Sequence, residues 1–252
     1  MQIIDGYTHC GLSKYHPIEQ VRAVMSGAGV DCTVLAQHLG EYDNTYIGDI
    51  AAGDPQHFAA VGLVDHESVQ AVDELEHLAS SGHFRGVRYT TDLITAAPHL
   101  LHEAARLGLV VVLWAPNGLG RHVTQLDHWL DSHADARLVI THLATPDIAE
   151  APHFKNAKAC FQLARHGNVY LQLSGMKMCC PYPHEPLYDL VAQGFEHFGP
   201  DRLYWGSNYP VVGDADDYHA DLRLLLEGKL PLPEDAIERV ASGNAKRLWF
   251  AR

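Results

Sequence analysis

The sequence of 252 residues has no apolar run near the length that a membrane helix needs. A helix that spans a bilayer requires about 20 consecutive apolar residues. The start, Met1 to Asp5, also lacks the basic flank and the cleavage site of a signal peptide, and an apolar segment follows at once. We therefore expect a cytoplasmic protein that has no membrane partner.

Basic residues are scarce, with 18 Lys and Arg against 31 Asp and Glu, so the formal net charge is -13. A field of this sign repels nucleic-acid phosphates and anionic lipid headgroups. The charge balance favours a small-molecule substrate and argues against a nucleic-acid partner. It leaves assembly into a homo-oligomer open.

Cysteine is also sparse and follows no metal or redox pattern. The five cysteines are Cys10, Cys32, Cys160, Cys179 and Cys180, and no two of them form a C-x-x-C pair. An odd number with two adjacent residues indicates free thiols in a reducing compartment. Cys179 and Cys180 have no evident helix N-terminus or basic pair to activate a nucleophile, so we do not assign them a catalytic role.

Glycine-rich phosphate loops are absent, since neither G-x-G-x-x-G nor a Walker sequence occurs. What the chain does contain is eight short apolar runs rich in Val, Leu and Ile, which is typical of strands buried on both faces. These runs are residues 2–9, 31–37, 58–64, 84–90, 110–115, 136–142, 169–174 and 202–208.

Helical patterns lie between the runs, at residues 17–28, 68–81, 97–107, 123–133, 154–166, 188–198, 218–226 and 234–250. The first begins with a proline and ends before Gly29, and the second has Ser68 as a candidate cap. Eight alternations favour a closed α/β barrel over an open doubly wound sheet. We predict a single (β/α)8 TIM-type barrel domain over residues 1–252.

Polar residues occur at three of the predicted strand ends. The first run carries Tyr7 and His9, another ends at His142, and the last ends at Asn208. The active site of such a barrel lies at the carboxyl ends of its strands. With a side-chain period of two, Asp5 is expected on the same face as Tyr7 and His9 but deeper in the barrel.

Two long connections follow strands at the same end, over residues 38–44 and 175–183, and we expect both to form walls of a substrate pocket. Arg88 lies near the end of the fourth run. Its guanidinium would bind a substrate carboxylate through two hydrogen bonds, and the alternative is a salt bridge within the barrel wall.

Three other side chains are predicted to contact substrate. Trp114 ends the fifth run, where it either stacks on a ring or packs beneath a loop. His38 follows the second run, and Lys177 lies on the long connection after the seventh, where a solvated lysine is the alternative. In the seventh run itself, one register turns Gln172 and Ser174 inward and the other turns the leucines inward.

Several segments, in this order, resemble the amidohydrolase superfamily. They are Ile-Ile-Asp-x-x-x-His at 3–9, Gly-Val-Arg at 86–88, Val-Ile-Thr-His at 139–142, Asn-Val-Tyr-Leu-Gln-Leu-Ser-Gly at 168–175, Trp-Gly-Ser-Asn-Tyr-Pro at 205–210 and Gly-Asn-Ala-Lys-Arg-Leu at 243–248. The resemblance runs from residue 2 to about residue 250. It is greatest to the amidohydrolase-related group that includes dicarboxylate lactonases and metal-dependent decarboxylases.

The resemblance implies a metal site whose ligands are replaced here. In that family a His-x-His pair, a later histidine and a last-strand aspartate hold a divalent ion. The matching positions are Tyr7, His9, His142 and Asn208. A phenol with a pKa near 10 is a poor ligand, and an amide is neither an anion nor a base. We expect no required metal, with His9 and His142 left to hold an ion such as zinc weakly, together with Cys10 or water.

The resulting hypothesis is a hydrolase that opens a small carboxylated lactone without metal. His142 or His9 would activate water, while Tyr7 and Asn208 would bind the oxyanion. One alternative keeps the barrel but makes it a decarboxylase or a lactone isomerase. Another is a catalytically inactive barrel that binds a ligand or a partner protein, which the replacements at Tyr7 and Asn208 favour.

Overall fold

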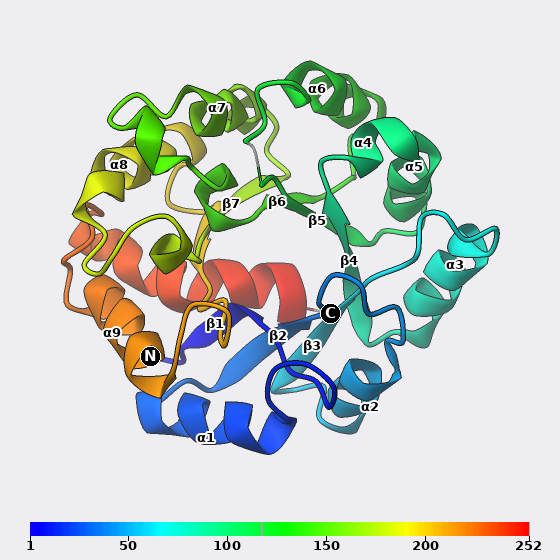
Figure 1. Cartoon of the computed structure of the whole chain (residues 1–252), viewed down its shortest axis with the longest axis horizontal. Coiled ribbons are helices and arrows are strands. Elements are labelled where there is room, and N and C mark those ends of the chain that lie inside the picture. The colour runs from blue at the N-terminus through cyan, green and yellow to red at the C-terminus, as the bar shows by residue number, and fades with distance from the viewer. Residues whose placement is uncertain (117, 252) are drawn as a thin grey trace.

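Eight parallel strands form one sheet in the order of the sequence, with helices around them (Figure 1). The last strand returns to the first, where Thr8 pairs with Tyr209 and the His9 main-chain nitrogen donates to the Tyr209 carbonyl at 2.8 Å. The computed structural model describes residues 1–116 and 118–251. The architecture confirms the predicted (β/α)8 TIM-type barrel.

The strands are β1 (Ile4–Thr8), β2 (Cys32–Ala36), β3 (Phe58–Gly62), β4 (Phe84–Thr90), β5 (Val110–Trp114), β6 (Leu138–Ile140), β7 (Val169–Leu173) and β8 (Leu203–Trp205). The α-helices are α1 (Ile18–Ala28), α2 (Thr45–Gly53), α3 (Ala71–Ser81), α4 (Leu93–Ala96), α5 (Pro98–Arg106), α6 (Val123–Ser132), α7 (Lys155–Lys158), α8 (Tyr188–Phe198) and α9 (Ala215–Leu226). Across residues 1–116 and 118–251, no helix has both the length and the apolar character to cross a membrane.

Short 3₁₀ and π-helical segments complete the chain. The 3₁₀ segments are His142–Ala144, Ile148–Glu150, Ala159–Arg165, Met176–Met178, Glu185–Leu187 and Glu234–Ala236, and the π-helical ones are Arg239–Gly243 and Lys246–Phe250. The predicted helix over 154–166 is therefore a short α-helix followed by a 3₁₀ helix, and the one over 234–250 is not a uniform α-helix.

Two further helix predictions need correction. The helix predicted from Ser68 begins at Ala71, because the Ser68 hydroxyl accepts from the Gln70 main-chain nitrogen at 3.1 Å within the preceding turn. Helix α2 was not among the predicted elements. Its nine residues include two glycines, which lower the intrinsic helix propensity, so packing rather than propensity supports it.

The pairing of β1 with β2 contains an irregularity between Asp5 and Thr8. A bulge of this kind adds a residue to one strand and inverts the alternation of side chains beyond it. Consequently Ile4 and Tyr7 both belong to the cluster that fills the barrel interior, although three positions separate them.

Asp5 therefore does not share a face with Tyr7 and His9, and that prediction is wrong. Its carboxylate accepts from the Thr8 hydroxyl at 2.5 Å and from the Ser207 main-chain nitrogen at 2.8 Å. It also lies beside Tyr218 of α9, whose pKa is raised by burial and then by this carboxyl group. The hydrogen bonds of Asp5 thus join β1 to the segment that follows β8.

The C-terminal helical segment closes one end of the barrel. Trp249 packs with Ile4, Cys32 and Val110, which stand at or near the starts of their strands, so it plugs the N-terminal end. A Cβ atom at Gly86 would lie 2.5 Å from the Val110 carbonyl and 3.3 Å from the Trp249 ring. Glycine at this position leaves the room that the indole occupies.

Replacing Trp249 by alanine should lower the free energy of unfolding by about 3–5 kcal/mol, because a fully buried indole leaves a cavity. Chemical denaturation monitored by circular dichroism measures this loss. Tyr42→Ala, at a side chain that is 43% exposed, is the matched control and should change stability little. Equal losses of stability in the two variants would contradict the assignment that Trp249 fills the N-terminal end of the barrel.

Candidate active site

The structure brings the four residues predicted at the strand ends into one buried group. The Tyr7 ring lies between His9 and His142, with ring centroids 5.1 and 5.3 Å away and interplanar angles of 82° and 87°. The Asn208 main-chain nitrogen donates to the Tyr7 carbonyl at 2.8 Å. The exposed fractions are 1% for Tyr7 and His9, 3% for His142 and 2% for Asn208.

His142 and Asn208 reach this group because the chain turns sharply just beyond β6 and β8. Their φ angles are 55° and 57°, in the left-handed region that non-glycine residues rarely adopt. The apolar runs predicted to end at these residues end as strands at Ile140 and Trp205. Left-handed non-glycine residues concentrate at functional sites, where packing holds them.

Both histidines are neutral bases. Nδ1 of His9 lies 2.6 Å from the Ala36 carbonyl oxygen, and Nδ1 of His142 lies 2.7 Å from the Ser174 hydroxyl. Burial, followed by the positive charge of Arg88, lowers the pKa of His142 to about 3 and holds that of His9 well below its usual value. Each ring is therefore unprotonated near neutral pH and able to accept a proton.

Tyr7 and Arg88 supply hydrogen-bond donors beside these bases. Burial raises the pKa of Tyr7, so the phenol keeps its proton. The Arg88 guanidinium lies 5.7 Å from the Tyr7 ring centroid and 5.9 Å from that of Trp114, and Nη1 donates to the Gln37 carbonyl at 2.9 Å. Arg88 thus bonds to a backbone carbonyl, in contrast to the salt bridge that the sequence left open.

Three buried donor atoms in this group have no hydrogen-bond partner within the described residues, namely the Tyr7 hydroxyl, Nε of Arg88 and Nε1 of Trp114. Buried polar atoms are nearly always paired, with the protein or with a ligand. The Arg88 guanidinium lies beside both rings, so the three unpaired donors belong to neighbouring side chains, and such a set suits a ligand that accepts hydrogen bonds. An oxygen-rich anion has this character.

His38 adjoins the group through Tyr15. The Tyr15 ring stacks on His9 at 5.1 Å and meets His38 edge-on at 5.4 Å. A hollow of about 140 Å³ lies beside them, and its lining includes Cys10, Gln37 and His38. This places His38 and the start of the 38–44 connection next to the predicted site.

Lys177 is engaged elsewhere, because its ammonium forms an ion pair with Asp217 of α9. The neighbouring Met178 does reach the site, and its Sδ lies 3.5 Å from Nδ2 of Asn208. The connection after β7 therefore contacts the cluster through a thioether, while its lysine is balanced by a carboxylate.

Comparison with known proteins supports the sequence resemblance. The sequence model of the amidohydrolase family matches residues 10–251. The chain belongs to the amidohydrolase family. It is 30% identical over 250 residues to a protein of Burkholderia ambifaria named L-fucono-1,5-lactonase, a match that covers 90% of this chain and 82% of that protein.

Solved structures share the fold of this amidohydrolase. A Pseudomonas putida protein proposed to be a 2-pyrone-4,6-dicarboxylic acid hydrolase has a TM-score of 0.79 at 20% identity, covering 98% of this chain and 97% of its own. An amidohydrolase from Burkholderia multivorans has a TM-score of 0.76 at 18% identity, covering 98% and 99%. At these identities the likeness concerns the barrel.

The donor set of this amidohydrolase does not fit the metal site that the resemblance implies. Among the residues that the structure describes, no three His, Cys, Asp or Glu side chains are grouped so that they could hold an ion. Burial raises the pKa of the Tyr7 phenol and raises that of the Cys10 thiol to about 12, so in the metal-free protein neither group is an anion ready to bind a cation. Asn208 turns its amide nitrogen toward Met178.

The sequence left the register of the seventh run undecided and gave no indication that Tyr15 belongs to the site. Tyr170 packs against the interior cluster while Leu171 and Leu173 pack outside it, so Gln172 and Ser174 face inward. Tyr15 was not among the predicted residues. Its only local sign is a position shortly after Gly11, where the chain leaves the first strand.

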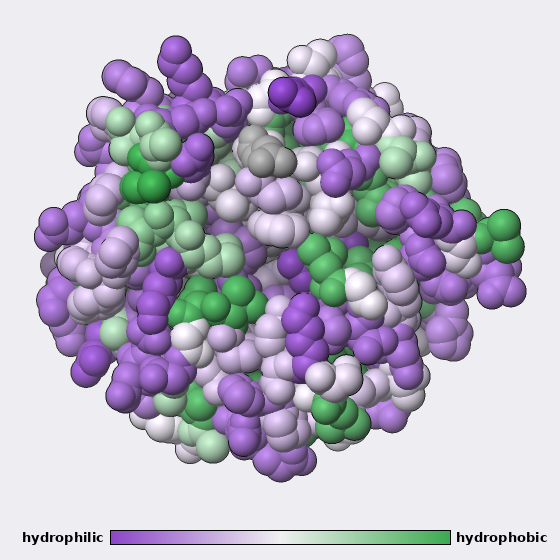
Figure 2. All heavy atoms as spheres, in the orientation of Figure 1, coloured by the Kyte–Doolittle hydropathy of each residue, from purple (hydrophilic) through white to green (hydrophobic). Residues whose placement is uncertain are grey.

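The surface around the strand ends is mixed. Leu12, Met178 and Val211 lie in the connections after β1, β7 and β8 and have exposed side chains. Figure 2 shows hydrophobic residues on the viewed face as separate groups among hydrophilic ones rather than as one apolar patch. The face therefore offers no broad apolar contact area.

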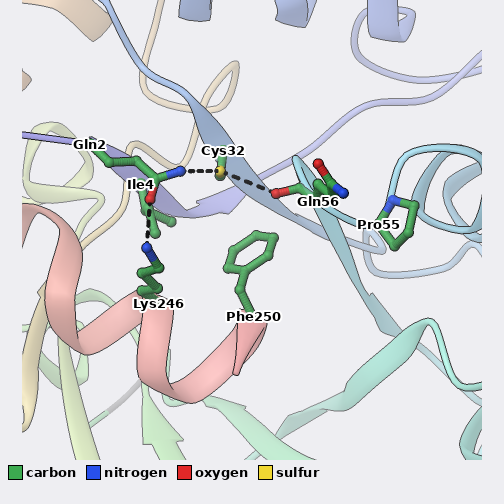
Figure 3. A pocket seen from close by; sticks show the side chains of 7 residues that line it. All are labelled: Gln2, Ile4, Cys32, Pro55, Gln56, Lys246 and Phe250. Atoms are coloured by element: carbon green, nitrogen blue, oxygen red, sulfur yellow. Dashed lines mark hydrogen bonds between the residues drawn. The ribbon is translucent and has the colours of Figure 1, made fainter. Parts of the chain in front are cut away.

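The opposite end of the barrel carries a larger hollow of about 460 Å³, which is lined by Gln2, Ile4, Cys32, Pro55, Gln56, Lys246 and Phe250 (Figure 3). Nε2 of Gln2 donates to the Cys32 sulfur at 3.3 Å, and the Lys246 ammonium donates to Oε1 of Gln2 at 3.1 Å. These polar groups satisfy one another. The N-terminal end of such barrels serves stability rather than catalysis.

Proposed function

We propose that this amidohydrolase opens a small carboxylated lactone by hydrolysis and does so without a metal ion. The observation that carries the proposal is the buried arrangement of two neutral histidines against a protonated tyrosine, with Arg88 beside them. Similarity to a protein named L-fucono-1,5-lactonase supports a lactone as the class of substrate, and Arg88 is the reason for adding a carboxylate to it.

The reaction begins when a histidine takes a proton from water. The water oxygen attacks the lactone carbonyl carbon, and the resulting oxyanion accepts hydrogen bonds from the Tyr7 hydroxyl and the Asn208 amide. The ring C–O bond then breaks, and the imidazolium returns its proton to the leaving alkoxide. The product is an open-chain hydroxy acid. A lactone is an activated ester, so these groups suffice without a Lewis acid.

Arg88 provides the reason for a carboxylated substrate. It is a buried cation whose Nη1 bonds to a backbone carbonyl and whose Nε lacks a partner within the described chain. A carboxylate would satisfy that donor and balance the charge. The Trp114 indole nitrogen, also without a partner there, offers a second donor near the same place.

The test incubates chelator-treated protein with a panel of lactones in heavy-oxygen water and analyses the products by mass spectrometry. We expect a hydroxy acid with one heavy oxygen in its carboxylate, formed at the same rate before and after chelation. His99→Gln, at an exposed histidine at the start of α5, is the control and should behave as the unaltered protein.

Other outcomes of this assay would overturn the proposal in distinct ways. An isomer without label would indicate lactone isomerisation, and released carbon dioxide would indicate decarboxylation. Activity that chelation abolishes and zinc restores would establish metal dependence. Binding without turnover across the panel would favour a barrel that only binds its ligand.

A further inference from the structure

Gln172 lies in β7 and Ser174 directly follows that strand, and both lie behind His142. Neither side chain takes part in the hydrolysis described above. We propose that they are positioning residues, which fix the proton of the neutral His142 ring on Nδ1 and leave Nε2 as the proton acceptor. The inference rests on the proposed function for its catalytic meaning. The hydrogen-bond assignment itself does not.

The orientation of the Gln172 amide is set by the strand beside it. Its nitrogen lies 3.3 Å from the Gly6 carbonyl oxygen and 3.0 Å from the Tyr204 hydroxyl. A carbonyl oxygen only accepts hydrogen bonds, so the atom that faces Gly6 must be the NH2 group. The amide oxygen of Gln172 therefore points to the Ser174 hydroxyl, 2.7 Å away.

That oxygen dictates the direction of the next two bonds. The Gln172 oxygen can only accept, so Ser174 donates its single proton to it. The Ser174 oxygen is then an acceptor toward Nδ1 of His142, at 2.7 Å, and Nδ1 must carry a hydrogen. A neutral imidazole has one N–H, which leaves a lone pair on Nε2.

Packing holds this chain of hydrogen bonds in place. All four side chains that take part are buried, namely Gln172, Ser174, His142 and Tyr204. The following residue, Gly175, has a φ angle of 63°, and a Cβ atom there would lie 2.8 Å from Nδ1 of His142. Only a residue without a side chain allows the ring to sit this close to the strand end.

This chain of hydrogen bonds from Gln172 through Ser174 to His142, the relay, also distinguishes His142 from His9. Nδ1 of His9 bonds to the Ala36 main-chain carbonyl, which no side-chain substitution removes. The tautomer of His142, in contrast, depends on a glutamine that can be changed without touching the substrate. Within the described residues, the Ser174 hydroxyl has two hydrogen-bond partners, the Gln172 oxygen and Nδ1 of His142. Without the Gln172 oxygen we expect the hydroxyl to donate to Nδ1, so that the ring proton moves to Nε2.

The test is 15N NMR of the histidine side chains at neutral pH, with the His142 signals assigned by His142→Gln. The unaltered protein should show His142 protonated on Nδ1. Gln172→Met, which keeps the chain length, should shift the ring to the Nε2-protonated form and lower kcat by about tenfold to hundredfold. Tyr204→Phe is the matched control, because it leaves the Gln172–Ser174 bond and should keep the Nδ1 proton.

A His142 ring protonated on Nε2 in the unaltered protein would overturn the inference, and this result needs no variant to fold. A Gln172→Met protein with the Nδ1 form and unchanged kcat would overturn it as well. If the lactone panel shows no hydrolysis while the predicted tautomers are found, the assignment of the relay is supported and the failure belongs to the proposed function.

Discussion

Replacing His142 by glutamine is expected to lower kcat for lactone opening by about 10²- to 10⁴-fold, the usual contribution of a general base. Glutamine approximates the size and polarity of the ring but cannot take a proton from water. The substrate contacts assigned to Arg88 and Trp114 remain, so KM should change little. Steady-state kinetics with the lactone found by the panel measure both constants.

The pH dependence follows from the environment of the same ring. Burial, then the Arg88 charge, lowers the pKa of His142 to about 3, and the unprotonated ring is the active form. The value of kcat/KM should therefore stay level from neutral pH downward and fall only as the pH approaches about 3. An acid limb near 6.5, the ordinary histidine value, would contradict a buried base.

Two further variants show which histidine acts. His99→Gln removes an exposed histidine and should leave kcat unchanged. His9→Gln tests whether His9, the other histidine that lies against the Tyr7 ring, is the general base. If His9→Gln abolishes turnover while His142→Gln leaves it intact, His9 is the base, and the relay behind His142 has a different purpose.

The fold could be predicted because it depends on local patterns that repeat. Eight apolar runs alternating with helices have few solutions other than a closed barrel, and capping glycines such as Gly29 and Gly82 adopt the expected left-handed conformation. Parallel strands in a barrel place their carboxyl ends together. The same pattern therefore predicts that four residues at strand ends lie close to one another, namely Tyr7, His9, His142 and Asn208.

The errors arise where tertiary packing overrides the local pattern. The bulge in β1 inverts the faces after Asp5, and no residue type in Asp-Gly-Tyr marks it unambiguously. Helix α2 contains two glycines and depends on its neighbours. The relay from Gln172 to His142 joins side chains 30 positions apart, so only the folded chain shows it.

Arg88→Met should weaken binding of a carboxylated lactone by about 2–5 kcal/mol, which corresponds to a rise in KM of about 30-fold to a few thousand-fold. Methionine keeps much of the buried volume but leaves the substrate carboxylate without its cation. A neutral lactone with the same ring loses no such contact, and its KM should change only a few-fold. Competition kinetics with the two lactones give the ratio.

The conservative variant and the neutral lactone decide what Arg88 does. Arg88→Lys keeps the charge but not the planar group that binds a carboxylate through two bonds. Its KM for the carboxylated lactone should therefore lie between that of the unaltered protein and that of Arg88→Met. Arg88→Met also removes a charge that lowers the pKa of His142, and the acid limb should move to higher pH for both lactones. Equal losses of binding on both lactones would show that Arg88 supports the barrel mouth rather than recognising a carboxylate.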